Sequence, residues 1–292
     1  MEPEPDNAPL VVIVGETASG KTALAIQLAK QFDGEIICAD SRTIYKGADI
    51  GTAKPLLEEQ SGVPHHLLDI VDMDEAFSAA DFKRRAQACI EDIAARGKVP
   101  FLVGGTGLYI DAVIFDFSFA NPPADPKERQ RLQALSVDEL TQEINDRQIP
   151  MPVNSRNPRH LIRALETGGK TTSDTTPRTN TLIIGLTIER EVLRQKLTSR
   201  VGAMVEAGFI DEVKRLSAQY GWSAPGLNAT GYKAFRAYVE GDISLDEAKA
   251  LFVQNDWKLA KRQRTWFKRN KSIHWVTDIK KAVELVTTFL NK

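Results

Sequence analysis

The sequence contains little cysteine and no long apolar run, and each absence argues against a class of protein. Its 292 residues include two cysteines, Cys38 and Cys89, both in apolar patterns, which argues against a disulfide framework. No stretch approaches the roughly 18 apolar residues that a membrane-spanning helix needs. The first residues, MEPEPDNAPL, have neither the basic nor the apolar part of a signal peptide. We therefore expect a cytoplasmic protein that does not enter a membrane.

An excess of charge of one sign is also lacking. The 38 Lys and Arg residues are balanced by 39 Asp and Glu residues, which leaves a formal net charge of −1. The chain is 42% hydrophobic and 26% charged, which is ordinary for globular proteins and excludes disorder or a coiled coil as a description of the whole. Its length allows about two domains.

The first part of the chain alternates between short apolar runs and helical patterns. Strands are predicted at Leu10–Val14, Glu35–Ala39 and Val99–Val103, and helices at Lys21–Phe32 and from a capping box at Ser78 to Arg96. Such alternation is typical of βαβ units and a parallel sheet. We predict an α/β fold whose parallel sheet is flanked by helices.

The pattern changes at residue 118, and residues 118–180 are predicted to form a small, mainly helical insertion domain. Its elements are a polar helical stretch at Pro126–Arg147, a short helix from Asn157-Pro158 to Thr167 and a polar loop at residues 170–180. The core then comprises residues 1–117 and 181–292. Its second part is predicted to contain a strand at Thr181–Ile188, a helix at Arg200–Leu216, a long helix from the capping box at Ser244 to about Arg269, an edge strand at Ile273–Thr277 and a final helix at Lys280–Leu290.

The segment GETASGKT fits the phosphate-binding pattern G-x-x-x-x-G-K-[ST] and lies between a predicted strand and a predicted helix. In such a P-loop, backbone N–H groups point at phosphate oxygens and the helix N-terminus adds positive potential. The lysine adds a mobile charge, and the threonine hydroxyl can bind Mg²⁺. The residues predicted to bind a phosphate or diphosphate are Gly15, Glu16, Thr17, Ala18, Ser19, Gly20, Lys21 and Thr22.

Two side chains follow predicted strands at the edge of the sheet where this loop should lie. Asp40 follows the second strand, and Thr106 follows the third in a Gly-Gly-Thr sequence. Because ligands bind at the carboxyl ends of parallel strands, both are expected to face the phosphate loop. Asp40 could bind Mg²⁺ through water, accept a proton from a nucleophile, or only cap the following turn. The strand before Thr106 lacks the final acidic residue that a hydrolytic ATPase or GTPase would place there.

The long C-terminal helix carries a basic stripe. Residues 258–271 include seven Lys and Arg residues and no acidic one, with Trp257, Trp266 and Phe267 interleaved. A stripe of this kind can be a solvated face, but in a chain of near-zero net charge it favours a nucleic-acid surface. Arginines of the insertion, Arg156, Arg159 and Arg163, strengthen this interpretation.

Eight segments, in order along the chain, resemble the signatures of the tRNA dimethylallyltransferases, the bacterial tRNA Δ²-isopentenylpyrophosphate transferase family. They are GETASGKT, ADSRTIYKGADIGTAKP, PHHLLDI, FSAADF, PFLVGGTGLY, LIRALE, GYKAF and AKRQRTWFK. The resemblance implies transfer of a dimethylallyl group from dimethylallyl diphosphate to N6 of the adenosine 3′ of the anticodon, with Mg²⁺ as cofactor. The partner would be a tRNA anticodon stem-loop, contacted in part by the insertion, and we expect a monomer.

The resemblance also implies roles for single residues. Asp40 would accept the N6 proton, Thr106 would place the extruded adenine, and Lys21 and Thr22 would stabilise the leaving diphosphate, with Thr22 as metal ligand. Lys233 matches a basic residue near the diphosphate. The residues that match RNA-contacting positions are Asp40, Ser41, Arg42, Thr43, Thr106, Arg129, Arg159, Arg163, Asn228, Lys261, Arg262 and Lys268.

The sequence departs from the family pattern at Glu16, where proline is usual, and at Thr43, His160 and Asn228. Because residue 16 is expected to contribute only its backbone, phosphate binding should survive that change. Three alternatives remain open: a kinase or an isopentenyltransferase acting on free adenine nucleotide, an RNA-binding P-loop ATPase, and a structural RNA-binding module. The basic helix argues against the first, the missing acidic residue against the second, and the intact P-loop against the third.

Overall fold

The computed structural model describes residues 8–117, 125–169 and 178–291. The chain forms two compact units: the core unit, Met1–Ile114 with Pro177–Lys292, and the insertion unit, Phe115–Thr176. The predicted insertion, residues 118–180, differs from this unit by a few residues at each end. Its predicted boundary at 118 and most of the predicted loop at 170–180 lie outside the described residues.

In the described part of the core unit, six parallel strands form one sheet in the order β3-β2-β4-β1-β5-β6. The strands are β1 (Leu10–Gly15), β2 (Gly34–Cys38), β3 (His65–His66), β4 (Val99–Gly104), β5 (Thr181–Leu186) and β6 (Ile273–Val276). The α/β fold and the parallel sheet predicted from the sequence are therefore confirmed. The predicted edge strand also forms, as β6 beside β5.

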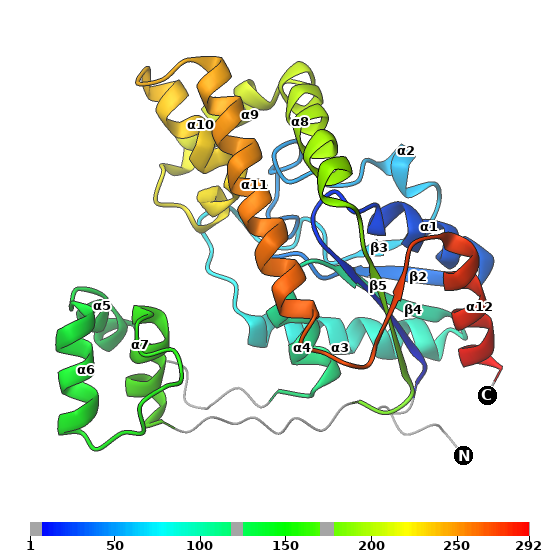
Figure 1. Cartoon of the computed structure of the whole chain (residues 1–292), viewed down its shortest axis with the longest axis horizontal. Coiled ribbons are helices and arrows are strands. Elements are labelled where there is room, and N and C mark those ends of the chain that lie inside the picture. The colour runs from blue at the N-terminus through cyan, green and yellow to red at the C-terminus, as the bar shows by residue number, and fades with distance from the viewer. Residues whose placement is uncertain (1–7, 118–124, 170–177, 292) are drawn as a thin grey trace. The chain divides into compact units, whose positions relative to one another are not determined.

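Helices cover both faces of this sheet (Figure 1). Every residue of β1 is buried, and because side chains alternate along a strand, each face needs its own cover. On one face, Val11 and Ile13 pack with α1 (Lys21–Gln31) and α12 (Ile279–Leu290). Three further helices also contact the sheet: α3 (Ala79–Ala95), α4 (Gly107–Ile114) and α11 (Leu245–Phe267).

A second hydrophobic cluster joins α8 (Arg190–Glu206), α9 (Phe209–Tyr220), α10 (Thr230–Glu240) and α11. The prediction of one helix at Arg200–Leu216 is wrong, because α8 ends before Ala207 and α9 starts after Gly208. Gly208 has a φ of 97°, a left-handed conformation that glycine adopts without steric cost and that ends the helix. The capping box at Ser244 forms as predicted and opens α11.

The insertion unit contains α5 (Pro126–Gln133), α6 (Val137–Asp146) and α7 (Pro158–Thr167), which share a small apolar core. The polar helix predicted at Pro126–Arg147 is divided in two. Ser136 accepts a hydrogen bond from the Glu139 N–H and starts a new helix with its own capping box. The short helix α7 begins after Asn157 as predicted. Two short elements of the core unit, α2 (Leu57–Gln60) and the 3-10 helix η2 (Pro225–Asn228), complete the described structure.

Among the described residues, none of the helices combines the length and the apolar character required of a membrane span.

Candidate active site

The phosphate loop joins β1 to α1 and presents an uncapped helix N-terminus. No described side chain caps the backbone donors of the first turn of α1, and that turn contains no acidic residue. Ala18 and Gly20 have positive φ values of 59° and 92° and curl the backbone. A Cβ atom at Gly15 would lie 2.7 Å from Ser19 Oγ and 3.3 Å from the Leu186 carbonyl oxygen, so glycine suits this close approach. These free donors form a binding site for an anion.

A cavity of about 770 Å³ lies against this loop. Its lining includes Lys21 and Thr22 of the loop, Asp40 after β2, Gly104 at the end of β4 and Arg200 from α8. The structure thus brings together the predicted phosphate loop and the predicted acidic residue, which are separate in the sequence.

Lys21 lies at the base of this cavity, and its Nζ donates a hydrogen bond to the Glu16 carbonyl at 3.2 Å. Burial lowers the pKa of the Lys21 ammonium to about 8, an effect that Arg200 increases and that Asp40 and Glu16 oppose. Because its ordinary pKa is about 10.5, Lys21 is a cation at neutral pH that loses its proton in the mildly alkaline range.

Hydrogen bonds order the segments that follow β2 and β4. Thr106 Oγ1 accepts a hydrogen bond from the Ser41 N–H at 3.0 Å, and Asp40 Oδ1 accepts one from the Arg42 N–H at 2.8 Å. Asp40 therefore caps the following turn and also lines the cavity. Among the described residues, Thr106 does not line the cavity itself, but its bond to Ser41 places it beside Asp40.

Arg200 is a cavity residue that the sequence interpretation missed. Its guanidinium donates to Thr17 Oγ1 at 3.0 Å and to Asp256 Oδ2 at 2.8 Å. Asp256, which is 1% exposed, also accepts a hydrogen bond from Thr230 Oγ1. The partner of Arg200, Asp256, lies 56 positions away in the sequence, so no local signal identifies Arg200. Lys233, predicted near the diphosphate, is exposed on α10 and is not among the described residues that line the cavity, and its role stays a prediction.

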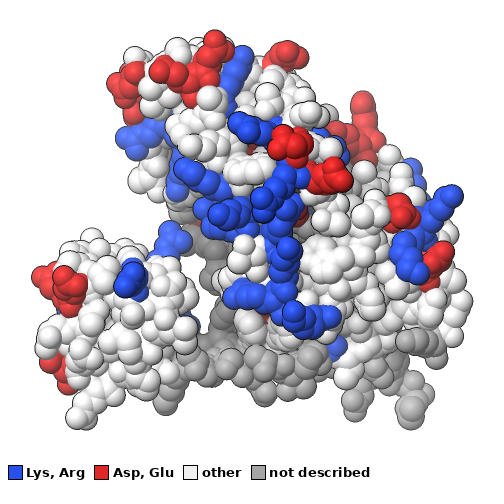
Figure 2. All heavy atoms as spheres, in the orientation of Figure 1, with Lys and Arg blue, Asp and Glu red and all other residues white. Residues whose placement is uncertain are grey.

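The predicted RNA-contacting residues of the core unit occupy two places. Arg42 donates to the Pro225 carbonyl, Thr43 is buried at the cavity, and Asn228 is exposed at the end of η2. Lys261 and Arg262 are exposed on α11, and Lys268 is exposed at its C-cap. Figure 2 shows Lys and Arg side chains gathered in a band over α8 and α11. The prediction of an exposed basic face on this helix is consistent with that band.

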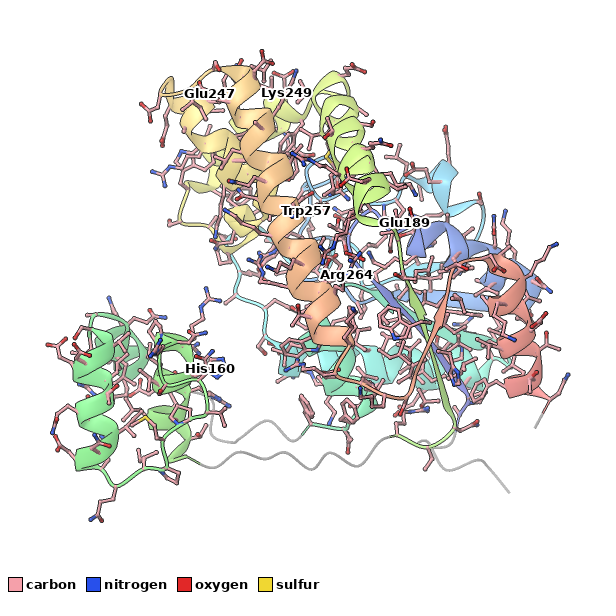
Figure 3. The ribbon with its side chains drawn as sticks, viewed as in Figure 1. His160, Glu189, Glu247, Lys249, Trp257 and Arg264 are labelled. Atoms are coloured by element: carbon pink, nitrogen blue, oxygen red, sulfur yellow. The ribbon has the colours of Figure 1, made fainter. Side chains whose placement is uncertain are left out.

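The next residues of α11, Gln263 and Arg264, do not belong to this exposed face. Gln263 accepts a hydrogen bond from the Thr17 N–H at 2.8 Å and donates one to the Gly105 carbonyl at 3.0 Å. Arg264, labelled in Figure 3, donates through Nε to a carboxylate oxygen of Glu16 at 2.9 Å. The Glu16 side chain is therefore a buried partner in an ion pair, and the expectation that this residue contributes only its backbone is wrong.

In the insertion unit, two of the predicted RNA-contacting arginines converge on one carboxylate. Arg129 and Arg163 approach Glu166 at 3.6 Å and 3.3 Å. Arg159 is exposed at the start of α7, where its N–H donates to the Asn157 side chain. His160 is exposed beside it (Figure 3). Arg129, Arg159 and Arg163 are all exposed, so each can contact a phosphate group.

Within the described residues, no group of three or more His, Cys, Asp and Glu side chains could hold a metal ion. The exposed Thr22 hydroxyl and the Asp40 carboxylate on the same cavity nevertheless fit Mg²⁺, which usually keeps several waters and binds substrate phosphates with one or two protein ligands. His66 bonds to Glu35 at 2.7 Å, as a structural residue would. Burial raises the pKa of the Cys38 thiol to about 12, in agreement with its place in the core.

Comparison with known proteins adds independent evidence on the family. The sequence model of the family described as IPP transferase matches residues 43–270. The chain belongs to this family. A tRNA dimethylallyltransferase from Exiguobacterium sp. is 43% identical over 288 residues, which cover 95% of this chain and 93% of the relative.

Solved structures of the IPP transferase family have the same fold. The full-length tRNA isopentenylpyrophosphate transferase from Bacillus halodurans is 40% identical, with a TM-score of 0.75 over 98% of this chain and 96% of that one. A eukaryotic dimethylallyltransferase acting on tRNA is 27% identical, with a TM-score of 0.81 over 98% of this chain and 80% of its own. Membership of this family makes the chain a transferase and argues against the kinase, the ATPase and the purely structural module.

Proposed function

We propose that this protein transfers a dimethylallyl group from dimethylallyl diphosphate to N6 of the adenosine 3′ of the anticodon in tRNA. The observation that carries the proposal is one cavity that combines an anion-binding loop, two cations, Lys21 and Arg200, and a carboxylate, Asp40. Its relatives are named tRNA dimethylallyltransferases, and a helix with exposed basic residues supports RNA as the acceptor.

The donor diphosphate would bind the phosphate loop. As the bond between C1 of the dimethylallyl group and oxygen breaks, its electron pair remains on the diphosphate, which becomes more negative. The backbone donors of α1, Lys21 and Arg200 stabilise that charge in a cavity already built to receive it. A magnesium ion held by Thr22 would supply further positive charge to the leaving group.

The acceptor would approach from the side of Asp40. The N6 lone pair forms the new bond to C1, and the proton that N6 loses passes to the Asp40 carboxylate. The Arg42 N–H fixes Oδ1 of this carboxylate, and the bond between Ser41 and Thr106 steadies the adjoining strand ends. The adenosine has to leave its stack, because a stacked base cannot present N6 to a buried carbon.

The RNA backbone would bind the exposed basic residues of both units. On α11 these are Lys261, Arg262 and Lys268, and in the insertion unit Arg129, Arg159 and Arg163. Ser41, Arg42, Thr43 and Asn228 are proposed to contact the nucleotides near the reacting base.

The test incubates the purified protein with Mg²⁺, dimethylallyl diphosphate and unmodified tRNA that has adenosine 3′ of the anticodon. Mass spectrometry of the digested nucleosides should detect one added C5H8 unit on adenosine. An Asp40→Asn variant is the matched control and should leave the nucleoside unmodified. Modification of free AMP in place of tRNA would overturn the acceptor, and absence of both products would overturn the reaction.

A further inference from the structure

The ion pair between Glu16 and Arg264 is the feature of the phosphate loop that neither the sequence pattern nor the proposed reaction explains. Glu16 is the second residue of the loop, and its carboxylate is 4% exposed. Arg264 donates to that carboxylate through Nε at 2.9 Å and through a second nitrogen at 2.5 Å. The same second nitrogen donates to the Ile188 carbonyl at 2.9 Å.

The pair lies beside the main cavity and not in it. Neither Glu16 nor Arg264 is among the described residues that line the 770 Å³ cavity. Both instead line two smaller cavities, of about 190 and 160 Å³. The charge of Glu16 still reaches the anion site, because it opposes the lowering of the Lys21 pKa and its own carbonyl accepts the Lys21 hydrogen bond.

A carboxylate at this position works against the function of the loop. An unpaired negative charge would repel the phosphate oxygens that the loop binds, and burial makes an unpaired charge costly in itself. Arg264 supplies the opposite charge at hydrogen-bond distance. Its neighbour Gln263 fixes the Thr17 N–H, so consecutive residues of α11 hold consecutive residues of the loop.

We propose that Arg264 is a positioning residue of the diphosphate site, which cancels the Glu16 carboxylate and holds the first turn of the loop, and that it is not part of the RNA-binding face of α11. The exposed basic residues of α11 bind RNA, whereas Arg264 points inward and serves the donor. The inference rests on the proposed function only in taking the ligand of the loop to be a diphosphate.

The experiment measures binding of inorganic diphosphate with Mg²⁺ by calorimetry, and separately binding of an anticodon stem-loop RNA at several salt concentrations. Arg264→Met should weaken diphosphate binding at least tenfold, because it leaves Glu16 unpaired. Glu16→Gln should leave the affinity unchanged or increase it, since it removes a negative charge. The double variant Glu16→Gln/Arg264→Met should recover most of the affinity that Arg264→Met loses.

Two further variants separate this role from RNA binding and from folding. Arg262→Gln should weaken RNA binding and reduce its salt dependence with diphosphate binding unchanged, which is the reverse of Arg264→Met. Arg236→Met breaks an exposed ion pair with Glu240 on α10 and should change neither affinity. If Arg264→Met does not fold, Arg264→Lys and Glu16→Gln still test the sign of the effect.

Several outcomes would overturn the inference. If Arg264→Met weakens RNA binding as Arg262→Gln does, or if Glu16→Gln weakens diphosphate binding, charge cancellation at the loop is not the role of the pair. A double variant that binds diphosphate as weakly as Arg264→Met does would lead to the same conclusion. Normal diphosphate binding by a wild-type protein that fails to modify tRNA would overturn the proposed function alone.

Discussion

The core unit and the insertion unit both contain networks of charged side chains, but they build them differently. In the core, Arg200 pairs with the buried Asp256, and Arg264 pairs with the buried Glu16 across 248 positions of sequence. In the insertion, Arg131 and Arg147 share Glu128 and Glu143 on an exposed surface. Buried pairs are costly to break, whereas exposed pairs contribute about 0–1 kcal/mol. Substitutions that break these two core pairs should therefore have larger effects than substitutions that break the exposed pairs of Arg131 and Arg147 in the insertion.

The largest effect is expected at Asp40, which lines the main cavity of the core unit. Asp40→Ala should lower the transfer rate about 10²–10⁴-fold through loss of a general base, while tRNA binding stays nearly unchanged. Single-turnover kinetics and RNA titration measure the two quantities. An equal loss of binding and transfer would show that Asp40 is structural and acts mainly as the cap of the turn at Arg42.

Asp256→Ala tests the cost of an unpaired charge in the core. Because Arg200 would lose a buried partner, the free energy of unfolding should fall by about 3–5 kcal/mol. Urea denaturation measures this, with Asp246→Ala, an exposed residue of the same helix, as control. A similar small loss in both variants would remove the contrast between buried and exposed pairs.

The third prediction concerns the exposed basic residues of α11, which are proposed to bind RNA. Neutralising Lys261, Arg262 and Lys268 together should reduce the slope of log K against log salt by about two, if each meets one phosphate of a partly single-stranded RNA. The free energy of unfolding should hardly change. An unaltered slope would place the RNA-binding surface elsewhere.

The lowered pKa of Lys21 predicts that diphosphate binding depends on pH. Its pKa is about 8, so the cation is present at pH 7 and is lost as the pH rises through 8, and binding should weaken over that window. Diphosphate itself also titrates, so the comparison is with Lys21→Arg, which stays charged. Parallel pH profiles for the two proteins would contradict a titrating Lys21.

The smallest effect is expected in the insertion. Arg147→Ala removes an exposed partner of Glu143 and Glu128 and should lower the free energy of unfolding by about 1 kcal/mol or less. Thermal unfolding of the intact protein measures it. A loss as large as that of Asp256→Ala would show that the two units do not differ in this respect.

The features that could be predicted from the sequence are those that depend on neighbouring residues, and the site residues that were missed depend on distant ones. Strands and capping boxes depend on neighbouring residues, and the strand at Leu10–Val14 and the capping boxes at Ser78 and Ser244 form as predicted. Residues 15–22 join a strand to a helix as predicted, and phosphate binding by them stays a prediction. The position of Asp40 after the second predicted strand placed it beside the phosphate loop, where the structure has it, and the family resemblance added its role as a base. The glycine at 208, which divides the predicted helix, was a local signal that was overlooked.

Arg200 and Arg264 could not be assigned from the sequence. Each depends on a partner more than 50 positions away, Asp256 for one and Glu16 for the other. A basic residue in a helix has the same appearance in the sequence whether it faces solvent, RNA or a buried carboxylate. The sequence therefore placed Arg264 in the basic stretch of residues 258–271, and only the fold separated it from Lys261 and Lys268.

The Glu16–Arg264 pair also limits the order in which evolution can assemble such a loop. An arginine gained first at position 264 can extend into solvent at little cost while residue 16 is still uncharged. A glutamate gained first at position 16 would be a buried, unpaired carboxylate next to an anion site. The low-cost path acquires the arginine before the glutamate, and once both are present neither is easily lost alone.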